Sequence, residues 1–438
     1  MIRRKISLAA ECELASQLGT TVIEEDVVDF MKQKLEGSDY TIRWLVNILN
    51  EKHSYFRSIM VTDSIEHVDI NDIGDGKGHL SKVYRVIFEF QTNKRPFEII
   101  VKFPVISILN KVRKDAGLDE MTDDHEDAQF VFDAHNHECD FYEMVSNQEP
   151  PAPFVPRVYY TAKTYPKQKI QGALVMESFF GRTAGLHYFD YVNKNQTINI
   201  TIALATIHAF VYRLEGQPWR KFEGDAFYSD RMVVVGDRIE EAANEYAITE
   251  FPKIETIRTA EFFRHSAFER AKELKAEGIV HGDCWGQNVL FKLNENGTVG
   301  DDLECFIDFQ MCNVGNPLCD IARWMSACVD ADIRREITTG VLDTYYKTLK
   351  SELARYNVKC PLTRENVQEL YELALVTQVF VCILLTPIFL KKSHSNVEGV
   401  DMAREEKWLL RVRLLVEDCI KLIHKNGWIH RFNLENSL

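Results

Sequence analysis

Several features that mark common classes of protein are missing from this chain. None of its ten cysteines forms a C-x-x-C pair, and Cys305, Cys312 and Cys319, spaced at seven-residue intervals, have no histidines at zinc-ligand spacing. The pattern does not indicate a zinc module or a disulfide framework. We expect free, mostly buried thiols in a protein of a reducing compartment.

The chain also lacks an excess of positive charge. Lys and Arg number 52 against 66 Asp and Glu, which gives a formal net charge of -14. Such a balance argues against nucleic acid or an anionic membrane surface as the main partner. Any anionic ligand must therefore be bound by a local group of residues.

The chain has no clear targeting segment, internal repeat or low-complexity region. Glu11 and Glu13 interrupt the apolar stretch that a signal peptide needs, so we expect a cytoplasmic protein. The apolar run 373–390 is long enough to cross a bilayer, but it contains Gln378, two threonines and Pro387. We interpret it as a buried core helix that breaks near Pro387, and we predict no membrane span.

The length of 438 residues and a hydrophobic content of 45% favour two lobes. Helical periodicity in the first part is confined to 41–53 and 127–145, and strand patterns occupy 83–90, 97–103 and 171–179. Helical patterns then dominate 197–215, 237–277, 319–356, 364–390 and 402–425. We predict an α+β fold with a sheet-rich lobe over 1–176, including a helical extension over 1–60, and a mostly helical lobe over 177–438.

The stretch IVHGDCWGQNVLFK, residues 279–292, places polar residues between two apolar runs. The strands 288–293 and 303–309 are joined by NENGTVGDD, in which Asn296-Gly297 is a turn signal. An antiparallel hairpin brings its open ends together, so Asn288 and Asp308 become neighbours. Their oxygens suit Mg²⁺ completed by phosphates and water, although a turn Asn and a backbone-bonded Asp remain the alternative.

Asp283 lies on the loop that leads into this hairpin, between Gly282 and Gly286. A carboxylate beside a metal can orient a substrate hydroxyl and accept its proton, as phosphoryl transfer requires. The two glycines allow tight turns around it.

The first lobe contains a candidate phosphate clamp. Gly74, Gly76 and Gly78 precede a strand, where backbone N–H groups could approach phosphates, or where they could form a plain hairpin turn. Lys102 lies inside a strand and needs a buried partner. Glu138, on the apolar face of helix 127–145, is the candidate, unless both are unrelated snorkelling side chains.

The order of five features resembles that of the small-molecule kinases of the protein-kinase-like superfamily. These features are the glycine loop, the strand lysine, the helix glutamate, H-G-D-x-W-x-x-N and I-D-F-Q. Within this superfamily, four motifs resemble those of the ecdysteroid kinase-like group of choline-kinase-type (CHK) domains. They are HGDCW (281–285), IDFQ (307–310), GNPLCDI (315–321) and NHECDFY (136–142). The resemblance covers roughly residues 70–395. It departs from the protein-kinase pattern in the glycine loop.

This resemblance implies a two-lobed kinase-like fold that uses ATP and Mg²⁺ to phosphorylate a small-molecule alcohol, such as a steroid-like one. It implies Asp283 as the catalytic base, Asn288 and Asp308 as metal ligands, and Lys102 with Glu138 as the phosphate clamp. It also implies that Met176, Glu177 and Ser178 lie near the hinge that holds adenine. Asp320 is expected to brace the catalytic loop.

Three other functions remain open. A protein kinase is disfavoured because Asp320 lies only twelve positions after Asp308 and no A-P-E motif follows. A nucleotide-binding pseudokinase is disfavoured because every role has a chemically competent residue. A choline-type or aminoglycoside-type kinase would differ only in its acceptor.

Three further residues are expected to support the fold. His208 is expected in the core, His281 as a hydrogen-bonding brace, and Trp285 packed under the loop. The sequence does not identify the acceptor or the oligomeric state.

Overall fold

The computed structural model describes residues 30–74, 80–115, 119–123, 125–222, 233–391, 395 and 397–432. The chain divides into two compact units. The first contains the described residues up to Asn147 together with Pro156–Phe179, and the second contains Gln148–Val155 and Phe180 onward. The chain therefore leaves the first unit for the last time just after its strand β5, Ala173–Glu177.

The first unit is built on one antiparallel sheet with the strand order β1-β2-β3-β5-β4. Its strands are β1 (Ile65–Asp72), β2 (Ser81–Phe90), β3 (Phe97–Pro104), β5 and β4 (Val158–Ala162). The predicted strands correspond to β2, β3 and β5. The sequence patterns did not reveal β1 and β4, because β1 buries only its first residue and β4 buries none fully.

Helices cover both faces of this sheet. α2 (Ile42–Lys52) and α3 (Ser54–Thr62) share an apolar core with Val101 and Phe103 of β3. Because side chains alternate along a strand, Lys102 lies on the opposite face, where α5 (Glu126–Ser146) contacts β3 and β4. The short helix α4 (Ser107–Asp115) follows β3 directly. The sequence-predicted lysine thus faces the sequence-predicted helix.

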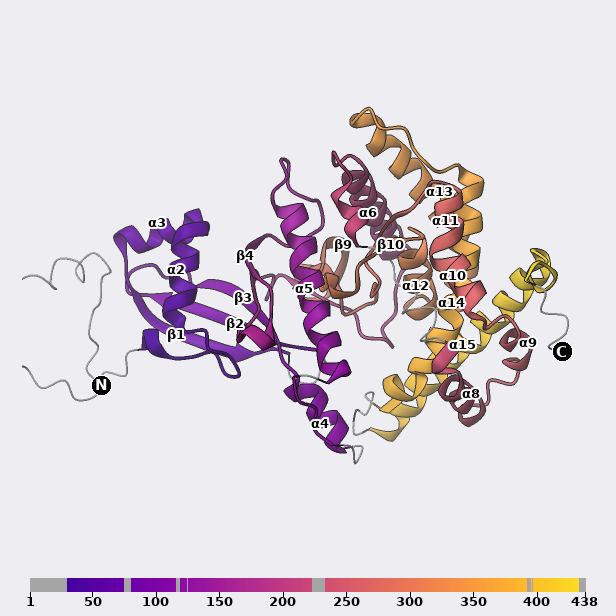
Figure 1. The fold of residues 1–438 in the computed structure, drawn as a ribbon, viewed down its shortest axis with the longest axis horizontal. Helices are drawn as coiled ribbons and strands as arrows, with labels where there is room; N and C mark the ends of the chain where they lie inside the picture. The colour runs from indigo at the N-terminus through magenta and orange to yellow at the C-terminus, as the bar shows by residue number, and fades with distance from the viewer. Residues whose placement is uncertain are drawn as a thin grey trace, which may run out of the picture. The chain divides into compact units, whose positions relative to one another are not determined.

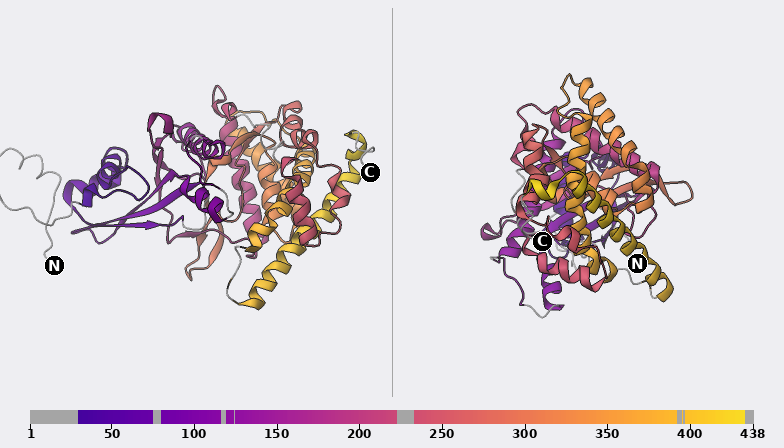
Figure 2. Two further views of the ribbon diagram at one scale, coloured as in Figure 1. Left: turned by 60° about the horizontal axis from the view of Figure 1, so that its bottom comes forward. Right: turned by 90° about the vertical axis from the view of Figure 1, so that its right-hand side faces the viewer.

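The second unit is mostly helical (Figure 1). Its longer helices are α6 (Lys194–Tyr212), α12 (Cys319–Ala327), α13 (Ala331–Arg355), α14 (Arg364–Lys391) and α15 (Glu398–Lys425). α14 and α15 lie side by side in the views of Figure 2 and contact each other. Its strands form a three-stranded sheet β6-β8-β9 and a two-stranded sheet β10-β7. The predicted α+β fold class, a small antiparallel-sheet unit with one main helix and a larger mostly helical unit, is confirmed.

Two predicted helical regions are interrupted. Residues 237–277 form α8 (Gly236–Glu245), α9 (Pro252–Glu255), α10 (Ala260–Arg264), a π-helical turn (His265–Glu269) and α11 (Arg270–Glu273). Pro252 begins α9 because its ring fits only the first helical turn, and the Thr259 side chain caps α10. Residues 319–356 divide into α12 and α13 before the α13 N-cap position, Asp330.

The expected helix break near Pro387 is wrong. α14 continues through Pro387 to Lys391. The proline lies in the last turns, where few backbone hydrogen bonds depend on it, and burial of Phe389 and Leu390 holds the end of the helix in place. α14 is also long and apolar enough to cross a membrane, but 78% of its most apolar window is buried within the structure. The prediction that no segment spans a membrane stays a prediction.

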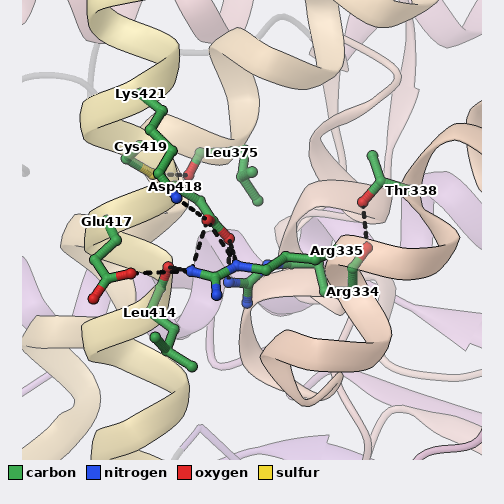
Figure 3. A network of polar contacts seen from close by, with 9 residues as sticks. All are labelled: Arg334, Arg335, Thr338, Leu375, Leu414, Glu417, Asp418, Cys419 and Lys421. Carbon is green, nitrogen blue, oxygen red and sulfur yellow. Dashed lines mark hydrogen bonds and ion pairs between the residues drawn. The ribbon is translucent and has the colours of Figure 1, made fainter.

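A charged network ties α13 to α15 (Figure 3). Arg334 and Arg335 both reach Asp418, with Arg334 Nη2 2.9 Å from Oδ2 and Arg335 Nε 2.9 Å from Oδ1. The two arginines are neighbours with different environments, because the Arg334 side chain is 2% exposed and that of Arg335 is 39% exposed. Glu417 accepts a further hydrogen bond from Arg335.

This pair allows a matched test of burial. We expect Arg334→Gln to lower the free energy of unfolding by about 3 kcal/mol, because a buried ion pair is broken in a site closed to water. Arg335→Gln should lower it by less than about 1 kcal/mol, because water screens the exposed pair. Denaturant unfolding of both variants measures the difference, and equal losses would contradict this view of the interface.

Candidate active site

The polar stretch 281–288 is a loop held between two small sheets. It follows β7 (Gly278–Val280), which pairs with β10 (Asn313–Gly315), and leads into β8 (Val289–Leu293). β8 pairs with β9 (Val299–Phe306), with Val289 opposite Phe306. One step further, the Ile307 N–H donates to the Asn288 carbonyl at 2.9 Å. The open end of the hairpin therefore carries Asn288 on one side and Ile307-Asp308 on the other.

Asn288 is bound directly to the candidate base. Its Nδ2 donates to the Asp283 backbone carbonyl and to Asp283 Oδ2, both at 3.0 Å. Because the amide nitrogen is engaged in this way, the amide oxygen Oδ1 remains as an acceptor, and no residue that the structure describes donates to it. Asp308 begins the next turn in the left-handed conformation, with φ of 69°, and accepts a hydrogen bond from Gln310 at 3.2 Å.

The predicted brace of the loop by Asp320 is confirmed. Asp320, on the first turn of α12, accepts hydrogen bonds from the N–H groups of His281 (2.7 Å) and Gly282 (3.1 Å). His281 also acts as a brace, because its Nε2 lies 2.9 Å from the Ile307 carbonyl while its Nδ1 accepts from the Asp283 N–H. His281 therefore links the two halves of the site through both of its ring nitrogens.

The electrostatics of the loop involve a residue that the sequence reasoning missed. Burial raises the pKa of the Asp283 carboxyl above its usual range, the charge of Asp308 raises it further, and the charge of Arg323 opposes this rise. Burial likewise raises the pKa of Asp320. Arg323 lies one turn after Asp320 on α12 and is only 9% exposed. A cation inside the apolar run of that helix was the available signal.

The residues at the hairpin end fit a hard divalent cation. An amide oxygen from Asn288 and the carboxylate of Asp308 are the oxygen donors that Mg²⁺ accepts, and a cation there would offset the repulsion between Asp283 and Asp308. Within the described ranges, no group of three His, Cys, Asp or Glu side chains could hold a metal alone. A metal at this position would therefore need oxygens from a ligand or from water.

In the first unit, Lys102 and Glu138 meet. Lys102 Nζ lies 2.7 Å from Glu138 Oε2, and their side chains are 9% and 1% exposed. The alternative of two unrelated snorkelling side chains is wrong. Such a buried pair fixes the ammonium group at one position on the face of β3.

The remaining sequence-predicted residues lie elsewhere in the same unit. Met176 and Glu177 end β5, with Met176 paired to Ile100 of β3, and the Ser178 hydroxyl donates to Glu98 at 3.4 Å. The Gly74 N–H donates to Asp72 Oδ1 at 3.0 Å. Gly76 and Gly78 lie outside the described residues. Nucleotide binding by these positions stays a prediction.

Two further features belong to packing rather than to the site. His208 is buried, and its Nδ1 lies 2.8 Å from the Tyr345 hydroxyl, as expected for a core histidine. A cavity of about 530 Å³ between α14 and residues 425–431 is lined by charged side chains such as Arg364, Glu372 and Lys425. Its carboxylate at Glu372 already accepts from Gln368, Lys425 and Asn426, and the cavity contains none of the candidate site residues.

Comparison with known proteins gives one family and one curated relative. Residues 60–427 match the sequence profile of DUF1679, described as "Uncharacterized oxidoreductase dhs-27". The protein of that name from Caenorhabditis elegans is 23% identical over 375 residues, which cover 84% of this chain and 44% of the relative. The chain thus spans less than half the length of the curated relative that it matches.

Among solved structures, similarity is found to aminoglycoside phosphotransferases. A GDP complex of an aminoglycoside 2'-phosphotransferase-IIIa mutant is 12% identical, with 85% of this chain and 98% of that chain covered and a TM-score of 0.41. A GDP and kanamycin complex of APH(2")-IIIa is 12% identical, with 86% and 97% covered and a TM-score of 0.41. Aminoglycoside phosphotransferase APH(4)-Ia is 12% identical, with 86% and 99% covered and a TM-score of 0.36. At these scores the likeness carries no argument about activity.

Two glycines with the same backbone conformation test how tightly the loop is packed. Gly282 and Gly297 have φ of 82° and 80°, but a Cβ on Gly282 would lie 2.2 Å from the Met311 carbonyl oxygen, whereas a Cβ on Gly297 would meet nothing. Gly297→Ala should cost about 1 kcal/mol of stability from backbone strain alone. Gly282→Ala should cost about 1–3 kcal/mol more, because the loop or Met311 must move. Thermal or denaturant unfolding of the two variants checks this, and equal losses would count against a tightly packed loop.

Proposed function

The chain belongs to the DUF1679 family, and from this premise we propose that it is an ATP-dependent phosphotransferase that phosphorylates a hydroxyl group of a small molecule. The observation that carries the proposal is the contact of Asn288 with Asp283 at the open end of the β8–β9 hairpin, where Asp308 also lies. This arrangement provides a base candidate and two oxygen donors in one place. Phosphoryl transfer requires little more than such positioning and charge stabilisation.

In the proposed reaction, Asp283 accepts a hydrogen bond from the acceptor hydroxyl and then takes its proton. The acceptor oxygen forms a bond to the γ-phosphorus of ATP as the bond to the β-phosphate oxygen breaks, and ADP leaves. Asn288 holds the Asp283 carboxylate in place through its Nδ2. Asp320 and His281 keep the loop from moving during this step.

Asn288 and Asp308 would hold a Mg²⁺ ion, which when bound supplies positive charge to the phosphates of the nucleotide. In the first unit, Glu138 would fix the Lys102 ammonium for nucleotide phosphates. We assign adenine binding to the chain around Met176, Glu177 and Ser178, and phosphate contacts to the loop of Gly74, Gly76 and Gly78. These assignments rest on the resemblance of the motifs.

For the acceptor, we propose a steroid-like alcohol of the ecdysteroid type. The support is the resemblance of HGDCW, IDFQ and GNPLCDI to the ecdysteroid kinase-like group. Two outcomes would replace this proposal for the acceptor. One is a choline-type or aminoglycoside-type acceptor, and the other is nucleotide binding without turnover. Magnesium-dependent transfer from labelled ATP to a panel of alcohols and a metabolite extract distinguishes them.

The oxidoreductase named in the family description is not favoured by the described residues. All strand pairs in this part of the chain are antiparallel. Dinucleotide-binding dehydrogenases of the doubly wound type use a parallel sheet, with the cofactor at the carboxyl ends of its strands. The curated relative is more than twice as long as the matched region, so its name refers to a larger protein.

Substitution of the base candidate separates chemistry from binding. We expect Asp283→Asn to reduce turnover by roughly 10² to 10⁴, because the carboxylate acts mainly in the transition state, and to leave ATP affinity nearly unchanged. Asp308→Asn should instead weaken binding of Mg·ATP, because it removes a charge from the proposed metal site. Steady-state kinetics and nucleotide titrations measure both effects. Normal turnover in Asp283→Asn would rule out the base role, and unchanged Mg·ATP affinity in Asp308→Asn would rule out the ligand role.

The Lys102–Glu138 pair predicts non-additive kinetics. Lys102→Met and Glu138→Gln should each lower kcat/KM, and the double variant should lose much less than the sum of the two effects, since both changes disable one clamp. Breaking a buried pair could also cost about 3–5 kcal/mol of stability. Thermal melts are therefore measured alongside the double-mutant cycle. Strictly additive losses in folded variants would show that the two residues do not act as a unit.

A further inference from the structure

Tyr188 is a buried aromatic residue of the second unit. It lies between β6 (Thr183–Ala184) and α6, and is 7% exposed. Its ring stacks on Phe389 at 3.9 Å between centroids, with 14° between the ring planes, and on Trp285 at 4.7 Å and 26°. Trp285 is two residues from Asp283 on the catalytic loop. Packing of this kind leaves the tyrosine ring little freedom to turn.

The backbone around Tyr188 is fixed as firmly as the ring. Arg411 of α15, which is buried, donates through Nη1 to the Tyr188 carbonyl at 2.9 Å, and its Nη2 pairs with Asp330 at 2.6 Å. Lys407, one turn earlier on α15, donates to the Phe189 carbonyl at 3.0 Å. The Leu186 N–H donates to the Gly286 carbonyl at 2.7 Å, which joins this segment to the catalytic loop itself.

The hydroxyl of Tyr188 differs from the rest of its side chain. No residue in the described part of the chain forms a hydrogen bond with it. Its oxygen is not fully enclosed by protein atoms. The oxygen is therefore open to a ligand. Burial and the negative charge of Asp283 raise the pKa of the phenol, so it remains a neutral hydrogen-bond donor at physiological pH.

The Tyr188 hydroxyl is held rigidly, lacks a protein partner and lies within electrostatic reach of the base candidate Asp283. Such a group is suited to bind substrate, because little conformational entropy is lost when it forms a hydrogen bond. We propose that the Tyr188 hydroxyl donates a hydrogen bond to an oxygen of the acceptor and so orients the acceptor beside Asp283. The inference rests on the proposed phosphotransferase function and specifies its acceptor side. It assigns Tyr188 to recognition of an oxygen-rich neutral alcohol, because a ring that is almost fully buried offers no face to a cationic ligand.

The test compares Tyr188→Phe with Tyr191→Phe in the full chain. The first removes only the inferred hydrogen bond and keeps the stacked ring, and the second removes a hydroxyl three residues away on a side chain that is 62% exposed. The probe is 20-hydroxyecdysone, a polyhydroxylated steroid. We expect Tyr188→Phe to lower kcat/KM for the probe about 10-fold, as the loss of one hydrogen bond predicts, with unchanged KM for Mg·ATP and an unchanged melting temperature. Tyr191→Phe should match the wild type in all three.

The outcomes separate this inference from the proposed function. Transfer to the probe at the same kcat/KM in Tyr188→Phe and wild type would overturn the role of Tyr188 and leave the phosphotransferase function standing. If the wild type transfers phosphate to no alcohol in the panel, the proposed function fails, and calorimetric titration of the probe then decides on Tyr188. Weaker probe binding by Tyr188→Phe than by Tyr191→Phe would support the inference, whereas equal affinities, or no binding to the wild type, would overturn it.

Discussion

The candidate site depends on one buried carboxylate, that of Asp320. It accepts the N–H groups of His281 and Gly282, two consecutive backbone donors that would otherwise be buried without partners. Gly282 can adopt its left-handed conformation against the Met311 carbonyl only because it has no side chain. The turn directs the following residue, Asp283, toward Asn288. Loss of the carboxylate would leave the loop without the anchor on which this contact depends.

The candidate site also brings like charges together. The charge of Asp308 adds to the pKa rise that burial causes at Asp283, and the charge of Arg323 opposes that rise. At Asp320, the pKa rise caused by burial is opposed first by His281 and then by Arg323. Negative charge therefore collects at the hairpin end, where Asp283 and Asp308 repel each other. A protein accepts such an imbalance in a partly buried place at a cost in stability, and the cost is reduced when a cation binds. This is the physical reason for linking the hairpin end to Mg²⁺ in the proposed function.

The loop is also supported by residues outside α12. α15 holds the segment around Tyr188 through Arg411 and Lys407, and the tyrosine ring stacks on Trp285. The expectation that Trp285 packs under the loop is confirmed by its stacking on Tyr188 and Phe389. Residues from α12, α14, α15 and the β6–α6 connection therefore meet around a short loop. A rigid support of this kind is what a site for chemistry requires.

The sequence by itself determined the elements whose signals are local. Alternating and helical patterns predicted the main strands and helices, and the Asn296-Gly297 turn predicted the β8–β9 hairpin, whose open end brings Asn288 to Ile307. A lysine inside a strand required a partner such as Glu138. Only the tertiary structure decided the rest. The edge strands β1 and β4, of which β1 is mostly exposed and β4 half-buried, depend on contacts between segments far apart in the chain. The same holds for the continuation of α14 through Pro387 and for the positions of Arg323, Tyr188 and Arg411. Such contacts leave no periodic pattern in the sequence, because a residue that binds a distant backbone carbonyl or ring needs only its own chemistry and the fold that brings its partner near.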